Sequence, residues 1–283
     1  MILSKKSSNI DSNLFINLVF SFFPISFILG NLIINLNLLL FCCLGIFHLK
    51  SRILKIKFDF VTKIILLFFF IVFFSTALSF LKFLYIDGYE YNNLSRLIKS
   101  IAFFRFFLML LIIYLLCEFD ILNLKYFFIS AAFVSIFVAL DIIFQYFFGF
   151  NIIGLRSKTF YHTGVFGDEQ IAGGFIQDFS FFSILFTTFI FKNKNYSRYI
   201  LTTIVISILG LGILFSHNRM PLILFLFGLV LLFLFNDELK KIISISLVVL
   251  AILFTLVFSS DEGLKGRYTS LYDNTIGQLI LLK

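Results

Sequence analysis

Residues that could carry chemistry gather in two short polar segments and a tail, between or after long apolar runs. The first segment, residues 155–170, holds Arg156, His162, two glycines, and the carboxylates of Asp168 and Glu169. A helix is expected to begin directly after it. Because a helix N-terminus offers free amide groups and a positive dipole end, this segment could hold an anion.

The second polar segment is Ser216–His217–Asn218–Arg219, and Pro221 suits the first turn of the helix that follows. A further arginine, Arg267, lies in the C-terminal tail. Guanidinium groups stay charged and bind phosphate oxygens in pairs, so Arg156, Arg219 and Arg267 together suit a phosphate or diphosphate. Each arginine alone could equally be a solvated loop charge.

Metal and nucleophile chemistry find little support. The three histidines, His48, His162 and His217, have no second His or Cys at ligand spacing, and the three cysteines all lie inside apolar runs. The chain has no phosphate-binding glycine loop and no Gly-x-Ser-x-Gly. We therefore expect a site without metal or cofactor.

Several polar residues are expected within the apolar runs themselves. Arg105, Asp141 and Asp178 are predicted at similar depths in three different helices, and Gln145 follows Asp141 by one turn. A charge in the bilayer costs several kcal/mol unless it is paired or wetted, so pairing of Arg105 with one of the aspartates is expected. Such a pair could serve function, or could only fix helix packing.

A polar stripe is predicted where the sixth run begins, and its members share one helical face: Gln170, Gly174, Gln177 and Asp178. This stripe cannot face lipid. It should line a cavity or a helix seam, where Gly173 and Gly174 would allow a close approach. A glycine-mediated helix contact with satisfied polar groups is the alternative.

The elements that must position these residues are membrane helices. Of the 283 residues, 60% are hydrophobic and only 13% charged, and the mean hydropathy is +1.06, which excludes soluble, disordered and disulfide-stapled classes. The net charge of +8 is dispersed among loops, so nucleic acid is not expected as a partner. We predict an all-α bundle of about nine transmembrane helices: Leu14–Gly30, Leu32–Leu49, Val61–Leu81, Leu97–Cys117, Tyr126–Phe148, Ile171–Phe191, Tyr199–Phe215, Met220–Phe235 and Ile242–Phe258.

Lysine and arginine set the expected orientation, because cytoplasmic loops retain them. Alternate breaks are basic, which puts the N-terminus in the cytoplasm and the segments at 150–170, 216–219 and beyond 259 on the outer side. We predict a transmembrane domain over 1–258 and, over 259–283, the start of an outer segment that reads as truncated. The chemistry is expected on the outer side, where the longest irregular segments fall.

Three features resemble the O-antigen ligase and O-antigen polymerase family of bacterial membrane glycosyltransferases. The stretch 164–173, Gly-Val-Phe-Gly-Asp-Glu-Gln-Ile-Ala-Gly, resembles the family's Gly-x-Phe segment leading from an outer loop into a span. Ser216–Arg219 resembles its Ser-Arg motif, with two residues inserted. Arg267 resembles the arginine that opens the family's large periplasmic loop.

The resemblance implies a metal-independent enzyme of the bacterial inner membrane whose active face is periplasmic. It would transfer a glycan from undecaprenyl diphosphate to a hydroxyl of the lipid A core (ligase) or of another lipid-linked glycan (polymerase). Arg219 and Arg267 would grip the diphosphate as negative charge develops. In the family, the histidine that acts as the general base lies further along the sequence than residue 283. His217, His162 or Glu169 would therefore have to replace it.

Two other readings remain open. A transporter or flippase for a lipid-linked or anionic substrate would use the same arginines and the same polar stripe without chemistry. No internal repeat is visible in the sequence, and the polar groups are expected near the outer side, which favours the transferase. The third reading is an inactive fragment that retains only the membrane fold.

Overall fold

The structure, a computed structural model, describes residues 7–50, 52, 58–86, 91–156, 161–191, 195–266 and 268–269. Nearly all of these residues are helical, and the only strand-like pairing among them is an isolated bridge between Phe150 and Arg156. The predicted all-α class is therefore confirmed. The chain divides into two compact units, Met1–Tyr126 and Phe127–Lys283.

Within the part of the chain that the structure describes, six helices are long and apolar enough to cross a membrane, which confirms a membrane-embedded protein. The qualifying segments are Asn31–Leu49, Phe60–Leu81, Ile98–Glu118, Leu124–Phe148, Tyr196–Phe215 and Lys240–Ser260. The other three predicted spans also fall on helices, but outside this set. Arg267 and residues 270–283 of the predicted outer segment lie outside the described residues.

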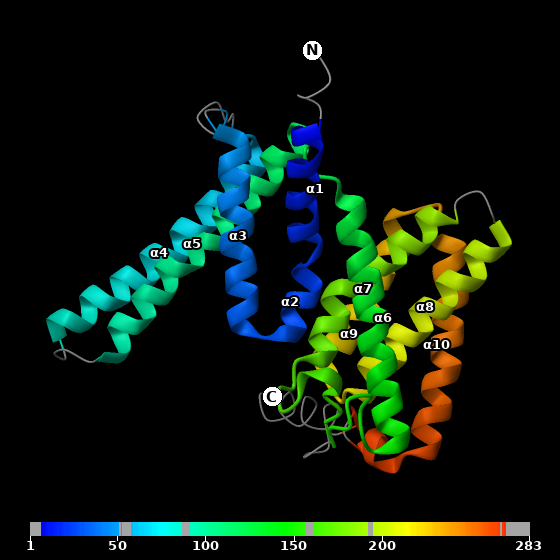
Figure 1. The fold of residues 1–283 in the computed structure, drawn as a ribbon. Coiled ribbons are helices and arrows are strands. Elements are labelled where there is room, and N and C mark those ends of the chain that lie inside the picture. Colours follow the sequence, from blue (N-terminus) through cyan, green and yellow to red (C-terminus); the bar gives the residue numbers. More distant parts are fainter. Residues whose placement is uncertain are drawn as a thin grey trace. The chain divides into compact units, whose positions relative to one another are not determined.

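The first unit holds five helices (Figure 1): α1 (Ser7–Ser21), α2 (Phe23–Leu29), α3 (Asn31–Leu49), α4 (Phe60–Ile86) and α5 (Tyr91–Glu118). The first predicted span is broken between α1 and α2, because Pro24 near the start of α2 lacks an amide hydrogen. Gly30 then makes the turn into α3 with φ +101°, at the boundary between the first two predicted spans. α4 and α5 pack side by side.

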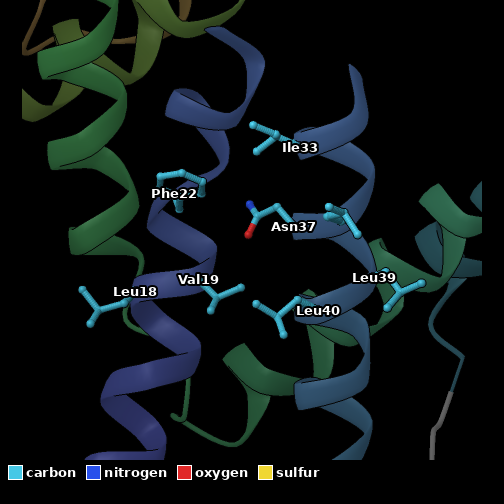
Figure 2. Close-up of a pocket in the computed structure, with 8 residues that line it drawn as sticks. Leu18, Val19, Phe22, Ile33, Asn37, Leu39 and Leu40 are labelled. Carbon is cyan, nitrogen blue, oxygen red and sulfur yellow. The ribbon is translucent and has the colours of Figure 1, made fainter. Parts of the chain in front are cut away.

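Polar contacts in the first unit concern its own packing. Asn17 on α1 donates to the carbonyl of Ile121 (3.0 Å) and accepts from the amide of Asn123 (2.6 Å), so it joins α1 to the chain after α5. A groove of about 510 Å³ runs between α1 and α3 (Figure 2). Its lining is aliphatic and aromatic except for the amide of Asn37.

The second unit comprises α6 (Leu124–Phe148, entering from the first unit), a short 3₁₀ turn η2 (Gly164–Phe166), α7 (Ala172–Ile190), α8 (Asn195–Phe215), α9 (Arg219–Phe235) and α10 (Lys240–Ser260). Short connections make α8, α9 and α10 alternate in direction. α8 packs against α7, α9 and α10, and is the central helix of the unit. On α6, Ser135 is hydrogen-bonded to Ser183 of α7 at 2.6 Å.

Glycine lets α6 and α8 approach closely. A Cβ added at Gly212 would lie 2.7 Å from the Cβ of Ala139 and 2.8 Å from its Cα. The Cα atom of Ala139 belongs to the backbone, so it cannot rotate away as a side chain could. The separation of these two helices therefore depends on the absence of a side chain at Gly212.

We predict that Gly212→Ala lowers the free energy of unfolding by about 1–3 kcal/mol, because the added methyl group must push α8 away from α6. The matched control is Gly174→Ala on α7, where a Cβ would meet nothing within 4 Å. That control should be neutral or slightly stabilising, since alanine favours helix. Thermal unfolding in detergent, followed by circular dichroism, measures both; equal midpoints would contradict the close contact.

Candidate functional site

Two buried side chains on α6 hold the loop that follows this helix. Asp141 and Gln145, one turn apart, are 0% and 1% exposed. An Asp141 carboxylate oxygen accepts a hydrogen bond from the amide of Ile152 at 2.8 Å, and Gln145 Oε1 accepts one from the amide of Gly164 at 2.8 Å. The same face of α6 thus binds the loop at two points twelve residues apart.

Asn151 closes the base of this loop from within. Its Nδ2 donates to the carbonyl of Gly164 (2.8 Å), and its Oδ1 accepts from the amides of Ile153 (3.1 Å) and Leu155 (2.7 Å). Asn151 was not among the predicted site residues, although an asparagine three residues after an expected helix end is typical of such turns. We call Asp141, Gln145 and Asn151 the loop anchor.

Gly164 is the residue on which the loop anchor converges. Its φ is +56°, and a Cβ there would lie 2.8 Å from the second carboxylate oxygen of Asp141. Glycine is required here by both conformation and space. The glycine of the predicted Gly-x-Phe segment therefore has a structural role, because it lets the loop pack against Asp141 of α6.

The second polar segment, Ser216–Arg219, meets the first. Asn218 Nδ2 donates to the carbonyl of Gln170 at 3.1 Å, and a Cβ at Gly173 would overlap Ser216 Oγ. His217 sits in this turn with φ +61°, a conformation that is rare for a non-glycine residue. Strained residues of this kind cluster at functional sites.

The structure brings together two of the predicted bases, His162 and His217, whose ring centroids are 5.3 Å apart. Tyr146 of α6 lies edge-on to His162 at 5.6 Å and stacks on Phe215 of α8 at 4.0 Å. We call His162, His217 and Tyr146 the histidine cluster. It lies at the end of the second unit where α6 and α8 terminate (Figure 1).

Asp261, directly after α10, joins this cluster. It accepts a hydrogen bond from the Tyr146 hydroxyl at 2.8 Å and one from the amide of Leu264 at 2.9 Å. The Leu264 amide, and then Tyr146 and the nearby His217, hold the pKa of Asp261 below its usual value. A fixed negative charge therefore lies beside the histidines.

Burial lowers the pKa of His162, and the charge of Asp261 opposes this shift without cancelling it. The ring is therefore neutral near pH 7. Its Nδ1 is buried and, within the described part of the chain, makes no hydrogen bond. A neutral imidazole with an open nitrogen can accept a proton, as a general base must.

The other predicted site residues that the structure describes are Arg156, Glu169 and Arg219. Glu169 and Arg156 are exposed, and Arg156 makes the backbone bridge to Phe150. Arg219 is half-buried at the start of α9, two residues from His217. Arg267 lies outside the described residues.

The members of the predicted intramembrane cluster lie in two different units. Arg105 belongs to the first unit, where its guanidinium lies 4.9 Å from the ring centroid of Phe106. Asp141 belongs to the second unit and binds the loop backbone. On α7, Gln177 is half-buried and Asp178 exposed. Pairing of Arg105 with an aspartate stays a prediction.

The described residues contain no group of three or more His, Cys, Asp or Glu side chains arranged to hold a metal ion. What the cluster offers is a hydrogen-bond acceptor in a buried position, flanked by aromatic rings and one carboxylate. This combination suits proton transfer from a bound hydroxyl group.

We predict that Gln145→Leu releases the loop, because the buried amide of Gly164 loses its acceptor at a cost of about 1–3 kcal/mol. Amide hydrogen exchange over residues 150–156 and 161–167 should accelerate. The matched control is Gln177→Leu, the same replacement at a half-buried position on α7. Equal exchange in wild type and Gln145→Leu would show that the loop does not depend on this bond.

We also predict that acid destabilises the protein through His162. Its pKa is lowered in the folded state, so the unfolded state binds the proton more readily, and stability is lost as pH falls below about 6.5. The unfolding midpoint should drop between about pH 7 and about pH 5, and His162→Gln should flatten this dependence. A pH dependence that His162→Gln leaves unchanged would contradict this origin.

Comparisons of the chain with protein-family models, with curated proteins and with solved structures find no match. The resemblance to O-antigen ligases and polymerases therefore rests on the short motifs at 164–173, 216–219 and Arg267. The functional case for this chain is carried by its own residues, above all by the histidine cluster.

Proposed function

We propose that the protein is a glycosyltransferase of the bacterial inner membrane that moves a glycan from undecaprenyl diphosphate to an acceptor hydroxyl at the periplasmic face. The observation that carries this proposal is that His162, half-buried in a loop held by α6, lies beside His217 and has a pKa lowered by burial. Such a base is what transfer to a hydroxyl group requires. Arg219, close by in sequence, would supply positive charge.

The proposed reaction is a displacement at the anomeric carbon of the transferred sugar. The acceptor oxygen forms the new glycosidic bond while its proton passes to His162, and the bond from the sugar to the diphosphate breaks. The diphosphate departs with the bonding electrons, stabilised by Arg219 and, in this proposal, by Arg267 and Arg156. His217 and Tyr146 would orient the His162 ring, and Asp261 would stabilise the imidazolium that forms.

The proposed topology has nine membrane crossings, with the N-terminus in the cytoplasm and the tail in the periplasm. Three observations support it. The predicted spans fall on helices, the first of them on both α1 and α2. Short connections make α8 to α10 alternate in direction, and lysines are found in alternate loops. This arrangement puts the histidine cluster at the periplasmic end of α6 and α8.

The acceptor is the lipid A core in the leading version of this proposal and a second lipid-linked glycan in the other. A transporter or flippase is the alternative from another class. Transport sites lie near the bilayer midplane between broken helices. The histidine cluster instead lies where α6 and α8 end, which favours the transferase.

The test is to express the chain in a Gram-negative host that lacks its own O-antigen ligase and to examine the lipopolysaccharide on a gel. We expect long-chain glycan on the lipid A core, or, in a matched polymerase-deficient host, lengthened repeats. His162→Ala should reduce the product by about 10²–10⁴-fold, and Arg219→Ala should abolish it.

His48→Ala is the matched control and should keep full activity, because His48 lies on α3 in the other unit. Membrane fractions must contain each variant at the wild-type level. Absence of product in both hosts despite normal amounts of protein would refute the transferase, and full activity of His162→Ala would remove this residue as the base.

A further inference from the structure

A second groove in the α6–α10 unit lies between the first turns of α8 and α10, far along α8 from His217. It has a volume of about 850 Å³. Both helices begin at this end, and they pack against each other along the groove. Its lining comes from α8 and α10 alone: Tyr196, Tyr199, Ile200, Thr203, Ile204, Lys241, Ser244 and Ile245.

The lining is most polar in the first turns of the two helices. Further along it is mainly isoleucine, and the hydroxyl groups of Ser244 and Thr203 are hydrogen-bonded to Lys240 and Ser246. Tyr196, Tyr199 and Lys241 lie in the first turns, whereas Ile204 lies about 12 Å further along α8 than Tyr196 at 1.5 Å per residue. Ile245 continues the apolar part on α10. This pattern, with tyrosine and lysine at the helix end and isoleucine in the following turns, is typical of a helix that passes from the membrane interface into the hydrocarbon core.

Lys241 is the one cation of this lining, and it is exposed. Its neighbours are neutralised: Lys240 pairs with Asp237 at 2.5 Å, and Arg198 pairs with Glu238 at 3.4 Å. Among the described residues, Lys241 has no carboxylate within ion-pair distance. The groove therefore presents one uncompensated positive charge at its polar end.

We propose that this groove binds one anionic phospholipid, with the phosphate at Lys241 and the acyl chain along Ile200, Ile204 and Ile245. The charge at the polar end fits the headgroup, and the apolar part fits the chain. The groove between α1 and α3 shows the contrast, because its lining holds no charged residue (Figure 2). That groove gives no reason to prefer an anionic lipid.

Fluorescence can test this site directly, because the chain has no tryptophan. A single reporter, Ile204→Trp, lies in the groove at a position that is 47% exposed. The protein is placed in phosphatidylcholine vesicles that contain brominated phosphatidylglycerol or, separately, brominated phosphatidylcholine, and quenching is compared. We expect the reporter to prefer the anionic lipid by about fivefold.

Two controls separate a site from general surface charge. The reporter Val248→Trp lies at a matching depth on α10, 61% exposed and outside the groove, and should show no preference. Lys241→Gln should remove the preference at Ile204→Trp, whereas Lys240→Gln, beside it but paired with Asp237, should keep it. Equal quenching by both lipids, or equal effects of the two lysine replacements, would overturn the proposal.

Discussion

The constraint on which the second unit depends is that buried backbone groups at the end of α6 must find hydrogen-bond partners within the protein. Asp141 and Gln145 are fully buried, and they meet this need by accepting from amides of the following loop. Asn151 satisfies a carbonyl and two amides of the same loop. Leaving the buried amide or carbonyl of Gly164 unpaired would cost about 1–3 kcal/mol, so the loop has one favoured path.

That path decides where the chemistry can occur. Gly164, held by Gln145, follows His162 by two residues, so the loop anchor also places the His162 ring. The turn with His217 is placed independently, by the contact of Asn218 with Gln170. Tyr146, on the same helix as the anchor, then connects this arrangement to Asp261 beyond α10. Hydrogen bonds from several helices thus determine the geometry of the histidine cluster.

Much of the fold was predictable from the hydropathy and the residue spacing of the sequence. The helices, the turn at Gly30 and the shared face of Asp141 and Gln145 follow from periodicity and chain chemistry alone. The break before Pro24 could have been predicted too, since proline disrupts a continuous helix. The hydrogen bonds to the loop backbone and the contact of Asp261 with Tyr146 could not have been predicted. They join residues 11 to 115 positions apart in the sequence, so they depend on how the chain folds back on itself.

The most direct test of the account is a titration of His162 by nitrogen-15 NMR, with signals assigned through His48→Gln and His217→Gln. If the loop anchor buries this ring, its pKa must lie below the usual value of about 6.5 in the wild type. The pKa should rise toward that value in Gln145→Leu, where the loop is released. Titration at about 6.5 or higher in the wild type, or a pKa that Gln145→Leu leaves unchanged, would contradict the link between the loop anchor and the site.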